Sequence, residues 1–166
     1  FFDSEEQVVG YMDPEINLYF TKGSMHALLK IDFEDKKPEA EDLKKYFDEN
    51  FVQGYYEDET EFLKVWESAN VFVPPVKDIE EFDLAGATYK ILTIEDPTDP
   101  EWVKYNERIQ VWIKFMIENG SYIDSDDGEW KIYTLFEYET TTKEYSFVGF
   151  LTFYIFYREN TKYRCR

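Results

Sequence analysis

The chain has 166 residues, and its 36 acidic side chains outnumber its 18 basic ones to give a formal net charge of −18 at pH 7. Hydrophobic residues make up 43% of the chain and aromatic residues 20%, a composition that excludes disorder and suffices for one sizeable domain or two small ones. The negative charge disfavours direct contact with nucleic acid and favours a basic partner. The lack of a long apolar run and the lone Cys165 predict a soluble intracellular protein that contacts no membrane.

The first part of the chain predicts a hairpin followed by two helices. Residues 16–20 and 25–33 alternate apolar and polar side chains around the turn sequence TKGS, which is the pattern of two paired strands. One helix is expected from residue 38 or 39 to residue 49, and a second over residues 59–68. The side chains that these helices are expected to bury are Leu43, Tyr46, Phe47, Phe62, Leu63, Val65 and Trp66.

A strand over residues 87–94 and a long helix are expected next. Asp99 is a candidate N-cap, and Pro100 follows it at the first helical position, where a missing N–H costs nothing. Gly120 is predicted to end the helix, because a residue without Cβ enters the left-handed cap conformation cheaply. One helical face recurs at three- and four-residue intervals and is expected to be buried: Trp102, Tyr105, Ile109, Trp112, Ile113 and Met116.

The last part of the chain predicts an antiparallel hairpin. Residues 130–138 and 145–157 are rich in aromatic and β-branched side chains, and they flank a polar turn at residues 140–143. The expected fold class is therefore α+β. Residues 1–96 would form an amino-terminal mixed α/β domain, and residues 97–166 a helix followed by antiparallel strands.

Blocks of sequence spread over most of the chain carry a family resemblance: VVGYMDPEINLYF, WVKYNERIQ, FMIENGSYID, the acidic turn before Trp130, and FVGFLTFYIFY. They resemble type B histone acetyltransferase catalytic subunits, a branch of the GNAT acetyltransferases, and the similarity is looser between residues 36 and 81. The resemblance implies that residues 97–166 are the first part of a GNAT-like acetyltransferase core, here incomplete. Residues 1–96 would then be the family's amino-terminal histone acetyltransferase domain.

The resemblance also implies a function. Family members transfer an acetyl group from acetyl-CoA to lysines of newly synthesised histone-four tails, with a WD-repeat histone-binding subunit as partner, in nucleus and cytoplasm. The family's Gln/Arg-x-x-Gly-x-Gly/Ala loop, which cradles the cofactor pyrophosphate, does not occur here, because the glycines of this chain are never clustered. We therefore expect an amino-terminal portion that lacks the main acetyl-CoA site and is inactive by itself. The competing hypothesis is a non-enzymatic acidic histone-binding or adaptor domain.

Glu118 is the candidate for acid–base chemistry, because a lysine ammonium with a pKa of about 10.4 must lose a proton before it can attack. Its expected place in the last turn of the long helix puts it at the negative end of the helix dipole. Apolar neighbours such as Phe115 and Tyr122 can desolvate it, and both effects raise a carboxyl pKa. The resemblance implies the same role, since a glutamate at this position is implicated in lysine deprotonation in the family. The alternative is a solvated glutamate at a helix end.

The resemblance implies three substrate-binding residues. Trp130 and Tyr154 match positions that line the histone-peptide groove, and both residue types can pack a lysine stem or ammonium. Glu6 matches an acid that contacts the peptide, whereas Ser4 stands where another acid is usual. The alternatives are ordinary sheet aromatics for Trp130 and Tyr154 and a solvated acid for Glu6.

Metal and triad chemistry are not expected. The acidic turn at residues 124–129 fails the spacing of a calcium loop, because counting from Asp124 puts glycine fifth and Leu135 twelfth. His26 is the only histidine and has no cysteine near it in sequence, which argues against a zinc site or a histidine-based triad. The turn is expected to be solvated, with attraction of a lysine-rich tail as its secondary role.

Overall fold

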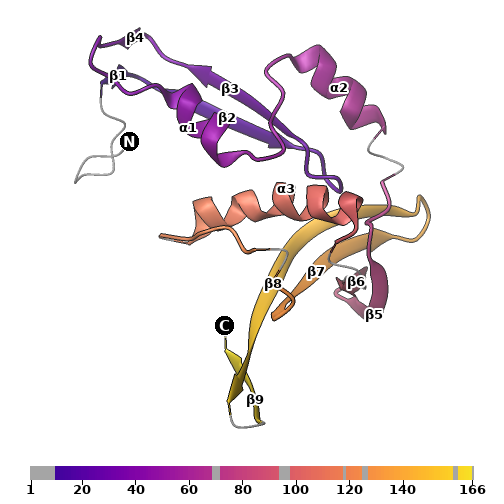
Figure 1. Cartoon of the computed structure of the whole chain (residues 1–166). Coiled ribbons are helices and arrows are strands. Elements are labelled where there is room, and N and C mark those ends of the chain that lie inside the picture. The colour runs from indigo at the N-terminus through magenta and orange to yellow at the C-terminus, as the bar shows by residue number, and fades with distance from the viewer. Residues whose placement is uncertain are drawn as a thin grey trace.

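The computed structural model of the chain (Figure 1) describes residues 10–68, 72–93, 98–117, 119–124, 127–158 and 161–165. Within these ranges the elements are, in chain order, β1 (Tyr11–Met12), β2 (Glu15–Phe20), β3 (Ala27–Asp32), β4 (Asp35–Lys36), α1 (Leu43–Asn50), α2 (Glu59–Ser68), β5 (Lys77–Leu84), β6 (Ala87–Thr93), α3 (Pro100–Met116), β7 (Trp130–Glu139), β8 (Glu144–Arg158) and β9 (Thr161–Cys165). The expected α+β class is confirmed.

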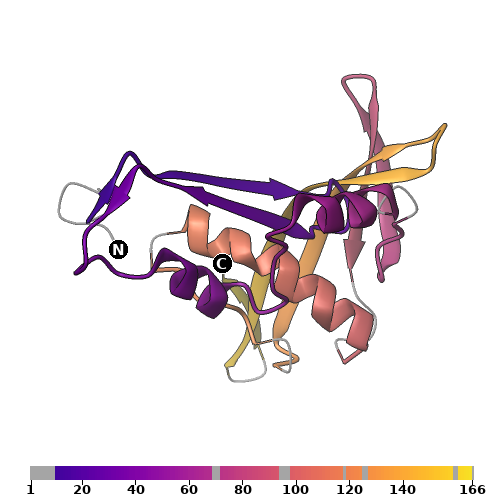
Figure 2. The ribbon, with the colours of Figure 1, turned by 90° about the horizontal axis from the view of Figure 1, so that it is seen from above.

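Helix α3 lies between two layers (Figures 1 and 2). On one side are the β2–β3 hairpin and α1, and on the other is a five-stranded sheet in the order β5-β6-β7-β8-β9. Each neighbouring pair in this sheet is antiparallel, including the predicted β7–β8 hairpin. The division of the chain near residue 96 stays a prediction; β5 and β6, which precede that residue, pair into the same sheet as β7 to β9.

The position of α3 explains why two separate core clusters form. Toward the sheet, Tyr105 and Ile109 are fully buried in a cluster with Leu92, Ile132 and Phe136. Toward the hairpin and α1, α3 contributes Val111 to a second cluster. The other buried members of this cluster are Ala27, Leu29, Phe47 and Phe51. A helix covered on two sides must present apolar side chains over more of its circumference than the single face that periodicity predicts.

The start of α3 is confirmed by its cap. The Asp99 carboxylate accepts hydrogen bonds from the backbone N–H groups of Glu101 and Trp102 at 2.8 and 3.1 Å, and Pro100 occupies the first helical turn. Two of the N–H groups that the first turn leaves without helical partners are thereby satisfied, and Pro100 has no N–H to satisfy.

The end of α3 differs from the prediction. The helix ends at Met116, which is 70% exposed rather than buried, and the left-handed residue beyond it is Asn119 (φ 55°), not Gly120. Gly120 is required for another reason. A Cβ at this position would lie 2.7 Å from Ile113 Cγ2, so only glycine lets the chain turn back closely over the last helical turn.

Two amino-terminal predictions are corrected and one helix is confirmed. The first helix begins at Leu43 rather than at residue 38 or 39, because the Asp42 carboxylate caps the Lys44 N–H at 3.0 Å. Helix α2 spans the predicted residues, but of its apolar side chains Phe62 is buried while Leu63 and Trp66 are exposed.

Strand β5 is not predicted, because its sequence KDIEEFDL is rich in acidic residues, which strands disfavour. None of the described helices is long and apolar enough to cross a membrane.

Candidate functional site

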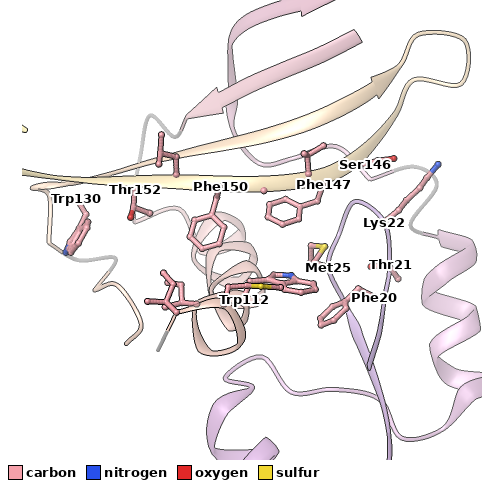
Figure 3. A pocket seen from close by; sticks show the side chains of 16 residues that line it. Phe20, Thr21, Lys22, Met25, Trp112, Trp130, Ser146, Phe147, Phe150 and Thr152 are labelled. Carbon is pink, nitrogen blue, oxygen red and sulfur yellow. The ribbon is translucent and has the colours of Figure 1, made fainter. Parts of the chain in front are cut away.

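A large apolar groove opens where the β2–β3 turn, the carboxyl end of α3 and strand β8 meet (Figure 3). Its volume is about 790 Å³. Among the described residues its walls are formed by Phe20, Thr21, Lys22, Met25, Trp112, Ile113, Met116, Ile117, Trp130, Ser146, Phe147, Val148, Gly149, Phe150, Leu151 and Thr152. The groove is thus built from segments that are distant in the sequence.

One wall is the β2–β3 turn, which is fastened to both neighbouring layers. The Phe147 N–H donates to the Lys22 carbonyl at 2.6 Å, and the Tyr105 hydroxyl donates to the Gly23 carbonyl at 3.2 Å. The Arg108 Nε donates to the Ser24 carbonyl at 2.8 Å. These bonds hold the backbone of the turn against β8 and α3 and so fix the width of the groove at this end.

The floor of the groove is aromatic and sulfur-rich. Trp112 packs on Phe20 with ring centroids 5.0 Å apart, and Met25 is buried beside them (Figure 3). The Trp112 Nε1 atom is buried and has no hydrogen-bond partner within the described part of the chain. Such a surface favours aliphatic or thioether groups and gives few polar anchors.

The opposite wall contains Trp130, one member of the predicted aromatic pair. Trp130 opens β7 and lies directly across the ladder from Tyr154 of β8, with ring centroids 5.1 Å apart at an interplanar angle of 74°. Trp130 lines the groove, whereas Tyr154 does not and instead contacts Trp130 edge-on. Partial desolvation, together with the negative charge of Asp127, raises the pKa of Tyr154. The structure therefore brings these two predicted residues together; their binding roles stay predictions.

Two predicted site residues cannot be placed. Glu118 and Glu6 lie outside the described residues. The predicted end of the long helix near Gly120 is wrong, because α3 ends at Met116 and its C-cap residue Ile117 is extended. Ile117 lines the groove.

Sequence reasoning missed most of the groove wall. Phe20, Met25 and Phe150 give no signal of their own, because hydrophobic residues at strand and turn positions are indistinguishable from ordinary core. No cluster of three or more histidine, cysteine, aspartate or glutamate side chains that could hold a metal ion occurs among the described residues.

Comparison with known proteins assigns the family. The sequence family described as Histone acetyl transferase HAT1 N-terminus matches residues 1–118. A protein from Candida albicans named histone acetyltransferase type B catalytic subunit is 31% identical over 166 residues, covering 95% of this chain and 40% of the relative. A protein of the same name from Yarrowia lipolytica is 32% identical over 92% of this chain and 34% of its own length. One from Mus musculus is 26% identical over 99% of this chain and 43% of its own length. The chain thus spans well under half of each of these relatives, and it belongs to the HAT1 family of type B histone acetyltransferases.

Proposed function

We propose that this chain forms part of a histone lysine acetyltransferase that transfers an acetyl group from acetyl-CoA to lysines of newly synthesised histone-four tails. Family membership supports the acetyltransferase activity, because the relatives are named as catalytic subunits. We propose that residues 97–166 are the first part of a GNAT-like core; the packing of α3 on β7 and β8 of the antiparallel sheet supports this assignment. A WD-repeat histone-binding subunit as partner, and action in nucleus and cytoplasm, belong to the same proposal.

The observation that carries the proposal is the groove with Trp130 in its wall. A lysine side chain is an aliphatic stem that ends in a cation, so it fits a site with apolar walls and an aromatic face. The groove offers Phe147, Phe150 and Trp112 to the stem. Acidic side chains stand beside Trp130, where Asp127 and Glu129 are half-buried. A net charge of −18 adds a general attraction for a basic tail.

The residues present do not fit the acetyl-CoA pyrophosphate. A diphosphate needs several consecutive backbone N–H groups at a glycine-rich turn, and the glycines of this chain lie at residues 10, 23, 54, 86, 120, 128 and 149, never clustered. We therefore assign no cofactor contact to this chain. We expect these 166 residues alone to bind the tail without acetylating it.

Glu118 is proposed as the base that deprotonates the substrate lysine. It follows Ile117 in the sequence, and Ile117 lines the groove. Desolvation by apolar groups would raise the pKa of such a carboxyl and favour uptake of a proton. General-base groups typically contribute roughly 10²- to 10⁴-fold to a rate.

The test is acetylation of a histone-four tail peptide by the full-length protein, compared with Glu118→Gln. We expect the substitution to lower the rate mainly below pH 8, where few lysine amines are already neutral. Glu137→Gln, which removes one exposed carboxylate of β7 away from the groove, is the matched control for charge. Equal rates for Glu118→Gln and wild type would remove Glu118 from the mechanism. A full-length protein that binds the tail tightly but never acetylates it would instead identify a histone-binding adaptor.

A further inference from the structure

The β2–β3 turn (residues 21–26) is closed on itself by bonds to one residue, Thr21. The Thr21 N–H donates to the His26 carbonyl at 3.0 Å, and the Thr21 carbonyl accepts from the Met25 N–H at 3.3 Å. Its hydroxyl oxygen accepts from the His26 N–H at 2.9 Å and bonds the Ser24 hydroxyl at 2.7 Å, and Thr21 is fully buried. The turn therefore has a defined internal shape, and contacts with other elements decide only where it lies.

Two of these contacts come from side chains of one helix. The Tyr105 hydroxyl donates to the Gly23 carbonyl at 3.2 Å, and the Arg108 Nε donates to the next carbonyl, that of Ser24, at 2.8 Å. Tyr105 and Arg108 are three residues apart in α3 and therefore lie on the same face of the helix. The Arg108 guanidinium lies 5.6 Å from the centroid of the Tyr105 ring. Helix α3 thus holds the turn by two neighbouring donors.

Neither donor is needed to bury apolar surface. The Tyr105 ring lies in the core cluster, where a phenylalanine would fill the same space without a hydroxyl. Burial raises the pKa of Tyr105 and lowers the pKa of Arg108, which shows that both polar groups lie in surroundings that disfavour charge. Keeping polar groups at such positions costs free energy unless they form hydrogen bonds. The bonds to the turn are what these two groups gain here.

The placement of the turn decides where Met25 lies. Met25 has a φ of 58°, in the left-handed region that is uncommon for a residue with a side chain. It is buried in the core cluster against which Phe20 and Trp112 pack, and all three residues line the groove (Figure 3). A backbone conformation of this kind persists where the surrounding contacts fix it. A shift of the turn would therefore move the Met25 thioether within the floor of the groove.

We propose that Tyr105 and Arg108 are positioning residues for substrate binding, which act through the β2–β3 turn to place Met25 in the floor of the groove. Neither residue lines the groove, so any effect on a ligand passes through the turn. The ligand is the aliphatic stem of the substrate lysine, which a thioether and aromatic rings suit, and this part rests on the proposed function. Helical periodicity by itself identifies Tyr105 only as a core residue.

Positioning and plain stabilisation predict different results for Tyr105→Phe, which removes the hydroxyl and keeps the ring. The matched control is Thr134→Val. The Thr134 hydroxyl is also buried and donates to a backbone carbonyl, that of Leu92, at 3.3 Å, but neither residue lines the groove. Both variants are expected to lower the melting temperature, because each leaves a buried carbonyl without its donor. Only Tyr105→Phe is expected to change the groove.

The first measurement needs no substrate. It is NMR of the full-length protein labelled at its methionine methyl groups, with Met25→Leu identifying the Met25 signal. Aromatic ring currents shift a methyl group that packs beside them, so we expect this signal to move in Tyr105→Phe and in Arg108→Gln. Thr134→Val should leave it in place. A Met25 signal that stays in place in either α3 variant would remove that residue from the positioning role.

The second measurement is binding of a histone-four tail peptide to the full-length protein by calorimetry, at a temperature where every variant is folded. We expect Tyr105→Phe and Arg108→Gln each to weaken binding about two- to tenfold, the range that ordering one side chain is worth. Arg108→Gln removes a positive charge, so electrostatics alone would tighten the binding of a basic tail. In the acetylation assay both variants raise KM for the tail and leave kcat unchanged.

Each other outcome counts against a defined part of the inference. Tighter binding by Arg108→Gln, or equal affinities of Tyr105→Phe and Thr134→Val, would overturn the positioning role. Failure of the wild-type protein to bind the tail would overturn the proposed substrate, while the Met25 signal would still decide whether Tyr105 and Arg108 place the floor of the groove.

Discussion

His26 gives this chain a built-in sensitivity to acid. It follows the buried Met25 at the end of the β2–β3 turn, and its ring lies against that of Tyr56 with centroids 6.2 Å apart. Burial, and secondarily the nearby Arg108 guanidinium, lower the pKa of His26 from 6.5 to about 4. The folded chain therefore resists protonation of this imidazole, and the unfolded chain does not.

The sign and size of the effect follow from that difference. Below pH 6.5 the imidazole of the unfolded state takes up a proton, whereas that of the folded state stays neutral down to about pH 4. The contribution of His26 to stability is therefore fully present above pH 6.5 and is lost progressively as the pH falls to 4. At 1.36 kcal/mol per pKa unit the full shift would be worth about 3.4 kcal/mol. The imidazole is only half-buried, and solvent screening reduces the expected loss to about 1–2 kcal/mol.

The assay uses the fact that His26 is the only histidine. Its single set of imidazole signals in a ¹H NMR titration reports the folded pKa directly, and urea unfolding at pH 7 and pH 5 gives the stability. We expect wild type to lose more stability between these pH values than His26→Gln does. Arg108→Gln is expected to raise the His26 pKa only partly, since burial is the larger cause.

Two results would refute this reasoning. A His26 titration midpoint near 6.5 would show that the imidazole is solvated. Equal losses of stability in wild type and His26→Gln between pH 7 and pH 5 would assign the acid sensitivity to the carboxylates alone.

Two further predictions concern the elements that shape the groove. Gly23→Ala puts a Cβ 2.5 Å from the Tyr145 carbonyl oxygen, so the β2–β3 turn must shift. We expect the free energy of unfolding, measured in urea, to fall by about 1–3 kcal/mol. Gly128→Ala, whose Cβ would meet nothing within 4 Å, is the control and should leave stability unchanged. Equal stabilities of the two variants would contradict the close contact. Asp99→Ala removes the cap of α3 and should cost about 1 kcal/mol. Asp99→Ser, which keeps a capping oxygen, should recover most of that loss, and a failure to recover would show that the cap is not the cause.

Much of the local structure follows from the sequence. Contacts between residues close in the chain set the N-cap at Asp99, the bounds of α2, and the β2–β3 and β7–β8 hairpins. Capping residues and the alternation of apolar and polar side chains reveal such contacts directly. The acidic composition and the family resemblance are likewise properties of the sequence. The blocks that carry the resemblance lie within segments that match the family's proteins.

The groove is decided by tertiary structure. Its walls come from β2–β3, α3 and β8, and the bonds that hold them together join residues far apart in sequence, such as Phe147 to Lys22 and Arg108 to Ser24. No local pattern encodes such pairs, because a strand or helix with an apolar face is compatible with many partners. The same reason hides the strand β5, whose acidic sequence becomes a strand only through its pairing with β6. Sequence alone thus determines the hairpins, the presence of the helices and the family of the chain, whereas packing on both sides of α3 decides where a substrate side chain could enter.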